Sequence, residues 1–534
     1  MVASFSMARP WNLRLTCVRN SIVLQKSERR ASSAGRPAAA DEAEIRAIED
    51  AFDRLGVSRN SLLEALLLVR DECGSVTEAG LQYLADRLRL TVAEVYEVAT
   101  AYPAVNYGRM EPYPGDAETC DDLVCALLKG GKGSPCHSGA GVCRGSCDGA
   151  VRNVSPRKFD RFRASGGYAV VERMLQDTNL KAQVLKDLGR GNAVGRAGQS
   201  FPVGQKWQRV LAAGGDPVVI VNADEGELAT FKDRYILESD PHGVLEAALV
   251  ATLVTGASQL FVYVRDDYVH LHCVLREAIR DVVIAGLSDG LQIDLRRSGG
   301  AYICGEETAL IASLEGRPPR PRERPPYPTE HGFHGRPTLV HNVETLYRLR
   351  GIWGAAVEPA IPVSGLLNAE AALFSVSGRV RSPGPKLVCG LQTLAGLVEE
   401  AGGLCDGVEL GGIVVGGAAG TIVPAHLCRV PLQELVASGL RLGTGSAVVF
   451  NVHDDARWIA ARMAGFLARE SCGQCSPCRV GTTKMARALS DGSLDHAALD
   501  DLSVAMSEAS ICALGRSAGK FLARVVRDFP EPRL

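Results

Sequence analysis

The stretch Asp216-Pro-Val-Val-Ile-Val-Asn-Ala-Asp-Glu-Gly-Glu227 decides the fold class of this 534-residue chain. Its first half is an apolar, β-branched run with the length of a buried strand. Its second half carries four polar side chains: Asn222, Asp224, Glu225 and Glu227. Each of these alone is more often a helix cap or a loop residue. Four of them directly after one strand favour a ligand site, because doubly wound sheets bind ligands at the carboxyl ends of their strands.

Neighbouring segments extend this α/β pattern. A helical pattern over 244–255 precedes a second strand-like run over 260–264. Upstream, the loop 195–207 contains glycines and Lys206, and such loops can surround a phosphate with backbone amides. A further strand-to-helix turn over 300–308 places Glu306 and Glu307 near a helix N-terminus, where a capping role is the alternative to a ligand contact.

A second type of site is indicated by Cys472-Gly-Gln-Cys475-Ser-Pro-Cys478, with Cys512 far downstream. Three evenly spaced cysteines and a remote fourth are typical of iron–sulfur ligation, so we expect a 4Fe-4S cluster. Zinc is the alternative, although its cysteines more often come as two separate pairs. A disulfide framework is disfavoured in a long chain without an evident secretory signal.

Sixteen cysteines are present, and five of them lie between Cys120 and Cys147. They include two pairs that could ligate a 2Fe-2S cluster: Cys120 and Cys125, then Cys143 and Cys147. A zinc site or unliganded thiols are the alternatives, and Cys136 adds a fifth thiol.

Composition excludes some classes of function. The net charge of -2 gives no case for a nucleic-acid or anionic-membrane partner. No apolar run reaches the roughly 20 residues that a transmembrane helix requires. The first forty residues are rich in Arg and Ser and resemble a transit peptide, but their weak amphipathic order favours a disordered leader.

We predict a multidomain α/β protein, divided as follows: a disordered leader (1–40), a helical bundle (41–104), a cysteine-rich region (105–165), an α/β domain (166–362), a β-grasp domain (363–445) and a helical 4Fe-4S domain (446–534). The β-grasp assignment rests on short strands at 374–380 and 412–416 around a helix at 394–401.

The motifs resemble the NADH-binding flavoprotein (51 kDa-like) subunit of respiratory complex I and its relatives, the diaphorase subunits of NAD-reducing hydrogenases and NAD-dependent formate dehydrogenases. The resemblance covers about residues 41–534 and is carried by these segments: 222–227, 230–233, 300–309, 324–328, 342–346, 470–479 and 510–515. The N-terminal region is similar to a fused, truncated 24 kDa-like subunit. Segments at 374–384, 416–420 and 529–532 are most similar to the β subunit of formate dehydrogenase.

The resemblance implies domain types, cofactors and residue roles. Residues 105–165 would be a truncated thioredoxin-like 2Fe-2S-type region, 166–362 a Rossmann-like, FMN- and NADH-binding domain, and 363–445 an SLBB-like domain. Bound groups would be FMN, a 4Fe-4S cluster, NAD(H) and a 2Fe-2S cluster at the N-terminal cysteines. Glu227 and Glu307 would be the catalytic contacts. FMN and NAD(H) would be bound by Gly195, Arg196, Gly198, Phe201, Gly204, Lys206, Asn222, Asp224, Glu225, Glu227, Tyr302, Gly305, Glu306, Glu307, Arg324, Tyr327 and Asn342. A flavin suits a position between NAD(H) and the clusters, because a hydride carries two electrons and an iron–sulfur cluster accepts one.

This chain departs from the family pattern at several positions. Ala197, Gln199 and Ser200 stand where the family loop has Gly, Ala and Gly. Leu228-Ala229 replaces a Pro-Gly pair, and His341 replaces an Asn. Added side chains where a glycine allows close approach or positive φ cost about 1–3 kcal/mol each.

Three functions fit these observations. The first is an NAD(H)-linked oxidoreductase module in the cytoplasm, the β subunit of a formate dehydrogenase that converts formate and NAD+ to CO2 and NADH. The second is a diaphorase of a hydrogenase or of a complex I-type assembly. The third is a flavin-less electron-wiring or structural relative, which the altered glycine loop favours. All three imply other subunits of a complex as partners.

Overall fold

A computed structural model describes residues 42–105, 156–177, 179–190, 202–354, 363–367, 371–492 and 496–528. Several expectations lie outside these ranges: the leader, the cysteines Cys120, Cys125, Cys143 and Cys147, and the loop residues Gly195, Arg196, Gly198 and Phe201. Short 3-10 helices join the main elements: η1 (Arg59–Ser61), η2 (Pro103–Val105), η4 (Tyr302–Gly305), η5 (Phe333–Gly335), η6 (Ser364–Leu367) and η7 (Ala425–Leu427).

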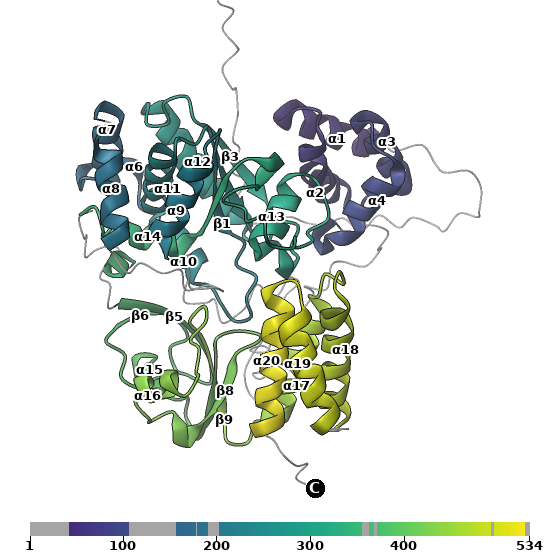
Figure 1. Cartoon of the computed structure of the whole chain (residues 1–534), viewed down its shortest axis with the longest axis vertical. Helices are drawn as coiled ribbons and strands as arrows, with labels where there is room; N and C mark the ends of the chain where they lie inside the picture. The colour runs from purple at the N-terminus through teal and green to yellow at the C-terminus, as the bar shows by residue number, and fades with distance from the viewer. Residues whose placement is uncertain are drawn as a thin grey trace, which may run out of the picture. The chain divides into compact units, whose positions relative to one another are not determined.

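The described chain begins with four helices, as the apolar spacing predicts (Figure 1). They are α1 (Glu42–Leu55), α2 (Leu62–Cys73), α3 (Glu78–Leu88) and α4 (Val92–Ala101). Thr91 caps α4 and forms a reciprocal capping box with Glu94. Apolar side chains of all four helices are fully buried and form one core.

The α/β region contains a four-stranded parallel sheet in the order β3-β2-β1-β4. The strands are β1 (Val218–Ala223), β2 (Gln259–Val264), β3 (Gln292–Arg297) and β4 (Thr338–Asn342). The two strands predicted from the apolar runs are thus confirmed. In register, Asn222 lies opposite Asn342 of β4, so both amides sit at the same carboxyl edge.

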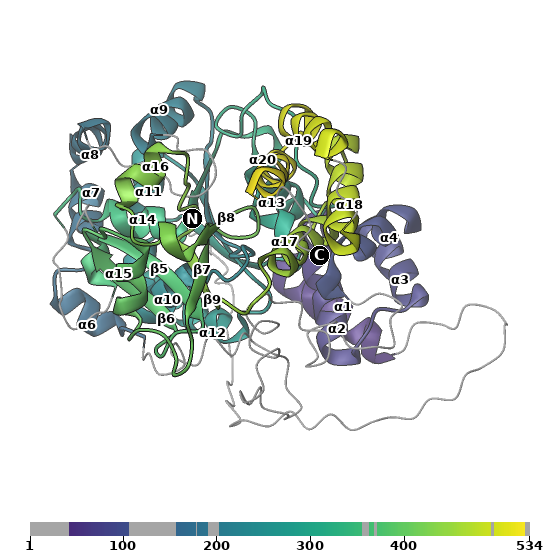
Figure 2. The ribbon, with the colours of Figure 1, turned by 90° about the horizontal axis from the view of Figure 1, so that it is seen from below.

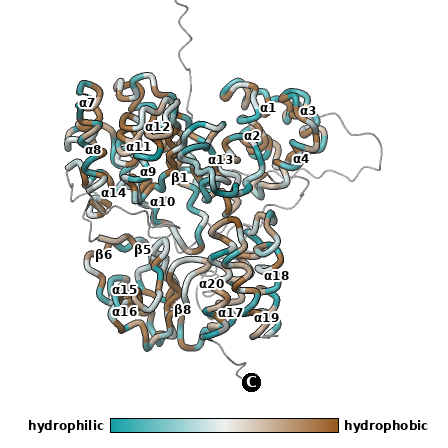
Figure 3. Tube along the Cα trace, in the orientation of Figure 1, coloured by the Kyte–Doolittle hydropathy of each residue, from teal (hydrophilic) through white to brown (hydrophobic). Residues whose placement is uncertain are grey.

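Helices cover this sheet. They are α6 (Phe159–Ala164), α7 (Ala169–Gln176), α8 (Asn179–Arg190), α9 (Val203–Ala213), α10 (Lys232–Ser239), α11 (Pro241–Thr255), α12 (Val269–Ile284), α13 (Glu307–Leu314) and α14 (Val343–Leu349). Helix α11 is buried along nearly its whole length, and Figure 3 shows it among the apolar segments beside β1. Phe162 of α6, Trp207 of α9 and Tyr347 of α14 pack into the same core.

A second, five-stranded sheet follows, with the order β6-β5-β9-β7-β8. Its elements are β5 (Ala371–Gly378), β6 (Gly384–Cys389), α15 (Leu394–Glu400), β7 (Leu410–Val415), β8 (Thr421–Pro424), α16 (Leu432–Ala437) and β9 (Ser446–Asn451). The sheet is mixed, since β5 pairs with β9 in parallel and the other pairs are antiparallel. Both helices pack against it in one core (Figure 2). We call residues 371–451 the β-grasp module.

The last described part is a bundle of four helices (Figure 1). They are α17 (Ala456–Arg469), α18 (Ser476–Asp491), α19 (His496–Ala509) and α20 (Ala513–Asp528). Cys475 is the N-cap residue of α18, and Cys512 directly precedes α20. Within the described ranges, the structure contains no helix that is long and apolar enough to cross a membrane.

Candidate functional site

The carboxyl end of β1 is joined to the segment that leads into α13. The Asn222 amide donates to the carbonyl oxygen of Gly305 at 2.9 Å. Ser298 donates its hydroxyl to Oδ1 of Asp224 at 2.6 Å. Two of the polar residues predicted after this strand, Asn222 and Asp224, therefore contact the 298–305 segment at the carboxyl end of the sheet.

Asp224 has an unsatisfied acceptor at this position. Its Oδ2 is buried and has no hydrogen-bond partner among the described residues. Burial raises the pKa of Asp224 to about 6, although the nearby Arg265 guanidinium and the Ser298 hydroxyl oppose this shift. A Cβ atom on Gly305 would lie 3.2 Å from the carbonyl oxygen of Asp224, so glycine keeps this place open. A buried, unpaired acceptor beside a glycine suits a ligand that brings hydroxyl or N–H donors.

Glu225 is engaged inside the protein. Its carboxylate accepts the backbone N–H groups of Asp233 at 2.9 Å and Arg234 at 3.0 Å, and thus holds the start of α10. Tyr268 donates to the same carboxylate at 3.1 Å. Burial, together with the negative charge of Asp233, raises the pKa of Glu225 to about 7. Glu225, which was predicted as a cofactor contact, therefore joins the end of β1 to the start of α10.

Asn342 links the end of β4 to α10. Its Oδ1 accepts from Nζ of Lys232 at 3.0 Å, and its Nδ2 donates to Asp233 at 2.6 Å. Burial disfavours the charge of Lys232, but Asp233 and Glu344 surround it and raise its pKa above the ordinary value. This network gives the edge of the sheet a fixed geometry.

On the other side of the strand end, Glu307 lies between two cations. Lys206 of α9 forms an ion pair with Glu307 and also donates to the carbonyl oxygen of Val340 at 2.6 Å. The Arg324 guanidinium lies 2.5 Å from Oε1 of Glu306 and 3.7 Å from Oε2 of Glu307. Glu306 also caps α13 by accepting the N–H groups of residues 308 and 309. The structure thus shows the capping role that the sequence left as the alternative, and the predicted cofactor contact of Glu306 stays a prediction.

Two further residues that were predicted as cofactor contacts, Gly204 and Tyr327, lie in described segments. Gly204 is buried in α9, one turn before Trp207. Tyr327 is 39% exposed, and the Arg209 guanidinium lies 5.7 Å from its ring centroid. An exposed aromatic ring next to cations suits stacking on a planar, negatively charged ligand.

Glu227 is held by donors from three segments. Its Oε1 accepts from the N–H of Leu228 at 3.1 Å and from the N–H of Ala418 at 2.7 Å. Its Oε2 accepts from the Tyr302 hydroxyl at 2.9 Å. Burial raises the pKa of Glu227, and these donors oppose that shift. The structure thus brings together Glu227 and Tyr302, two predicted contacts that are distant in sequence.

The four C-terminal cysteines line one small pocket. Its walls are formed by Ile303, Pro321, Ser471, Cys472, Gln474, Cys475, Cys478, Ile511, Cys512 and Leu514. Burial raises the pKa of Cys478 to about 12 and that of Cys512 to about 11. Such thiols stay protonated unless a cationic metal group takes the place of the protons. The pocket therefore gathers four thiols of the kind that bind an iron–sulfur cluster.

The 3-10 helix η4 borders both sites. Tyr302 contacts Glu227 at the strand end, whereas Ile303 forms part of the cysteine pocket. The backbone N–H of Tyr302 donates to Oε2 of Glu470 at 2.9 Å, and Glu470 stands two positions before Cys472. One residue step thus separates the polar strand-end site from the cysteine pocket.

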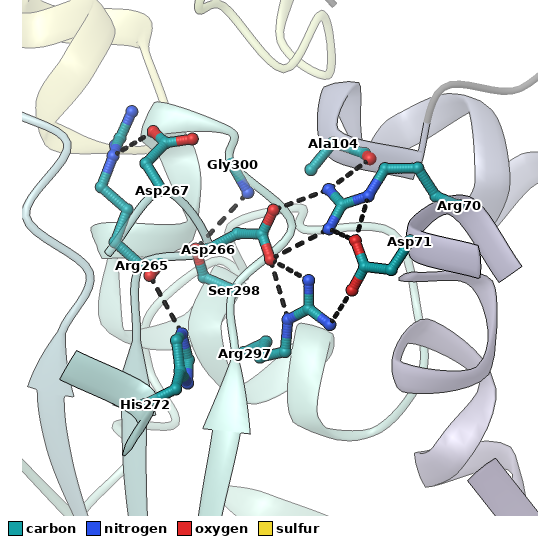
Figure 4. Close-up of polar contacts among 10 residues, drawn as sticks. All are labelled: Arg70, Asp71, Ala104, Arg265, Asp266, Asp267, His272, Arg297, Ser298 and Gly300. Atoms are coloured by element: carbon teal, nitrogen blue, oxygen red, sulfur yellow. Dashed lines mark hydrogen bonds and ion pairs between the residues drawn. The ribbon is translucent and has the colours of Figure 1, made fainter. Parts of the chain in front are cut away.

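The N-terminal bundle contacts the sheet edge through a cluster of charges, drawn in Figure 4. Asp266, just after β2, accepts from Arg70 of α2 at 2.7 Å and from Arg297 of β3 at 2.5 Å and 2.8 Å. Asp71 also pairs with both arginines. The backbone of Ala104 donates to the carbonyl oxygen of residue 299 at 3.2 Å. The bundle therefore supports the 297–300 segment next to Ser298 and Asp224.

Sequence reasoning missed three contacts of this region: Ser298 on Asp224, Glu470 on Tyr302 and Ala418 on Glu227. Each joins segments that are separated by between 74 and 191 positions, so no local pattern reveals them. Two of these contacts involve segments that the sequence analysis singled out for their resemblance to known proteins, 416–420 and 470–479, but the resemblance indicated no partner for either segment.

Comparison with known proteins identifies the class. Residues 190–350 match the Nuo51 FMN-binding domain, and residues 458–533 match the NADH-ubiquinone oxidoreductase-F iron-sulfur binding region. Residues 48–134 match the thioredoxin-like [2Fe-2S] ferredoxin family, a range that includes Cys120 and Cys125 and ends before Cys143. Fold and site thus define an oxidoreductase of the FMN- and iron–sulfur-binding class. The match over 458–533 decides for an iron–sulfur cluster against the zinc alternative.

The relatives narrow this class. The chain is 34% identical over 398 residues to the NADH-quinone oxidoreductase F subunit of Aquifex aeolicus, covering 71% of this chain and 92% of that protein. The corresponding F 2 subunit of Rhizobium meliloti is 34% identical over 400 residues, with 69% of this chain and 91% of that protein covered. The chain belongs to the family of NADH-quinone oxidoreductase F subunits, which confirms the predicted resemblance.

Two solved structures of NAD+-reducing [NiFe]-hydrogenase are also similar. The H2-reduced form aligns with a TM-score of 0.66 and 26% identity over 89% of this chain and 92% of that chain. The air-oxidised form gives a TM-score of 0.57 and 33% identity over 68% of this chain and 64% of that chain. The relationship to the β subunit of formate dehydrogenase stays a prediction.

Proposed function

We propose that this chain is the NAD(H)-linked electron-transfer subunit of a larger oxidoreductase, in which it passes electrons between NAD(H) and a partner subunit. The observation that supports this most is the position of η4. Its first residue belongs to the strand-end site, and its second lines the cysteine pocket. A hydride-accepting group on one side and a one-electron carrier on the other would be separated by a single segment.

Different residues would hold the FMN and the 4Fe-4S cluster. The unpaired Oδ2 of Asp224, the open space at Gly305 and the cation Lys206 would hold FMN, which when bound exchanges a hydride with NAD(H) and single electrons with a cluster. Cys472, Cys475, Cys478 and Cys512 would hold the 4Fe-4S cluster. The cysteine pairs of the N-terminal region would hold a 2Fe-2S cluster.

NAD(H) would lie against the exposed side of this site. We place Glu227 and Glu307 as the two carboxylates that touch the dinucleotide or flavin, with Arg324 and Tyr327 as its cationic and aromatic contacts. No general acid or base is needed for hydride transfer, so these side chains act by orientation and by keeping water away.

The test is to purify the chain and measure FMN content and NADH-dependent ferricyanide reduction. One equivalent of FMN and NADH-dependent turnover are expected. A protein that contains the 4Fe-4S cluster but neither retains FMN nor oxidises NADH would refute the proposal and support the flavin-less electron-wiring alternative.

For the parent complex we propose an NAD-dependent formate dehydrogenase in the cytoplasm. The segments at 374–384, 416–420 and 529–532 support it, since they are most similar to the β subunit of that enzyme. A hydrogenase diaphorase is the second candidate, favoured by the similarity to NAD+-reducing [NiFe]-hydrogenase, which extends over 89% of the chain. Metal analysis of the complex that copurifies with the tagged chain separates the two. Molybdenum or tungsten with formate-dependent NAD+ reduction supports the first, and nickel with hydrogen-dependent reduction refutes it.

A further inference from the structure

The β-grasp module lies between the two family matches at 190–350 and 458–533, and neither assigns it a role. Between β7 and β8 it has the turn Gly416-Gly-Ala-Ala-Gly420. Gly416 donates to the carbonyl oxygen of Ser446 on β9 at 3.1 Å, and Gly420 donates to that of Gly417 at 2.9 Å. The turn is therefore closed and fixed to the sheet of its own module.

This turn reaches the strand-end site of the α/β region. The N–H of Ala418 donates to Oε1 of Glu227 at 2.7 Å, the shortest of the three hydrogen bonds that this carboxylate accepts. The other two come from Leu228 and Tyr302, which lie within the α/β region itself. Hydrogen bonds to an ionised acceptor are about twice as strong as neutral ones, so the contact from the turn contributes substantially to the orientation of the carboxylate.

Glycine is required at position 417 for this contact. A Cβ atom there would lie 2.3 Å from Cδ and 2.4 Å from Oε1 of Glu227. Any other residue would have to displace the carboxylate or the turn. Gly417 also has a φ of +85°, which is unfavourable for residues that carry a Cβ.

The turn is supported from behind. Arg524 of α20 donates to the carbonyl oxygen of Ala419 at 2.9 Å, and α20 begins directly after Cys512. Beside the turn, the hydroxyls of Thr230 and Thr444 are 2.8 Å apart, which joins the module to the segment after Glu227. The turn is thus held by three parts of the chain and can keep Glu227 in one conformation.

We propose that the Gly416–Gly420 turn of the β-grasp module is a positioning element of the NAD(H) site, which orients the Glu227 carboxylate through the N–H of Ala418. The inference rests on the proposed function, because it requires that Glu227 faces NAD(H). A contact of this kind orients a binding side chain without touching the reacting atoms. Its loss weakens dinucleotide binding and leaves the turnover of bound NADH unchanged.

The experiment compares Gly417→Ala with the matched control Gly407→Ala in the full-length, FMN-containing protein. Gly407 belongs to the same module and has a φ of +71°, but a Cβ atom there meets no atom within 4 Å. Both variants therefore introduce similar backbone strain, and only Gly417→Ala disturbs Glu227. We expect KM for NADH to rise on the order of tenfold in Gly417→Ala, with kcat within about twofold of wild type. Gly407→Ala should keep the wild-type KM, and FMN content should be equal in all three proteins.

A second variant removes the hydrogen bond alone. Replacing Ala418 by lactic acid keeps the methyl group and exchanges the backbone N–H for an ester oxygen, and KM should rise in the same direction. This variant decides the question if Gly417→Ala fails to fold. The inference is overturned if the folded variants retain the wild-type KM for NADH, or if kcat falls while KM stays constant. A wild-type protein without NADH oxidation would instead refute the proposed function, so the two failures are distinguishable.

Discussion

Replacing Asp266 by Asn should loosen the N-terminal bundle from the edge of the parallel sheet. The Asp266 carboxylate accepts hydrogen bonds from Arg70 of α2 and Arg297 of β3, as Figure 4 shows. Asn keeps the shape of the side chain and one acceptor, but it removes the negative charge between the two guanidinium groups. We expect α2 to open from the sheet edge more often than in the wild type.

The expected loss of free energy in Asp266→Asn depends on how buried the ion pairs are and on the partners that the two arginines keep. The side chain of Asp266 is 8% exposed, and those of Arg70 and Arg297 are 20% and 19% exposed. Removing one member of a buried ion pair costs about 3–5 kcal/mol, because the other charge is left without compensation. Asp71 remains and pairs with both arginines, which reduces this cost. We therefore expect a loss of about 2 kcal/mol in the free energy of local opening.

Amide hydrogen exchange of α2 measures this opening. Since 1.4 kcal/mol corresponds to a factor of ten, exchange of the α2 amides should become roughly 30-fold faster in Asp266→Asn. Asp267→Asn is the matched control. Its carboxylate is 51% exposed and pairs with Arg265 at 2.8 Å, and Figure 4 shows no bond from it to the bundle. Equal exchange rates in the two variants would refute a role of the Asp266 carboxylate in this contact.

The same contact predicts a dependence on pH. Burial raises the pKa of Asp266, but Arg297 and Arg70 more than offset this effect, and the result lies below the ordinary value of 3.8. A carboxyl group with a lowered pKa contributes stability that is present above its unfolded pKa and is lost as the pH falls through its folded pKa. After correction for intrinsic exchange rates, the difference between wild type and Asp266→Asn should persist at neutral and mildly acidic pH. It should vanish only below about pH 4.

Three further predictions concern single residues. Cys475→Ser should abolish the EPR signal of the 4Fe-4S cluster and electron transfer to the partner subunit while NADH-dependent ferricyanide reduction persists; undiminished physiological transfer would contradict the proposed path. Because the pKa of Asp224 is raised from 3.8 to about 6, its contribution to stability is present below the unfolded pKa and is lost as the pH rises through about 6. In thermal unfolding at pH 8, the flavin-free Asp224→Asn protein should therefore be more stable than wild type by up to about 3 kcal/mol, and the two proteins should converge near pH 4. Ala229→Gly should not lower the unfolding temperature, because Ala229 has a φ of +56°, which glycine adopts without strain. The control Ala488→Gly, within α18, should lower the free energy of unfolding by about 0.5–1 kcal/mol. Equal losses of stability in the two variants would show that no strain is relieved at position 229.

Sequence patterns predicted the elements of the fold where the cause is local. The strand at 218–223 follows from its β-branched apolar run. The capping role of Glu306 at the N-terminus of α13 was one of two roles that the sequence allowed, because a cap depends on the next three residues only. The spacing of the first three cysteines likewise suffices to predict their common site.

The remaining part of the site depends on contacts between distant segments. Whether Glu225 faces a ligand or α10 is decided by the fold, since its two N–H partners lie eight and nine positions downstream and close only when α10 packs on β1. The contact of Ala418 with Glu227 shows more clearly what a sequence pattern cannot predict. Its backbone N–H has no side-chain signature, so the glycine pattern at 416–420 indicates a tight turn but not the carboxylate that the turn contacts.

The geometry of η4 explains how one chain can couple a two-electron and a one-electron site. The turn is closed by backbone hydrogen bonds from Cys304 to Ala301 at 3.0 Å and from Glu306 to Ile303 at 3.0 Å. Tyr302 and Ile303 are therefore held on different sides of one rigid segment, one toward Glu227 and the other in the cysteine pocket. Because Glu470 binds the backbone N–H of Tyr302, the cysteine-bearing turn is fixed to this segment whatever side chain stands at position 302. The separation of the two sites thus depends on this local backbone structure, on the Glu470 carboxylate and on the Tyr302 ring, whose centroid lies 5.3 Å from that of Phe466 in α17.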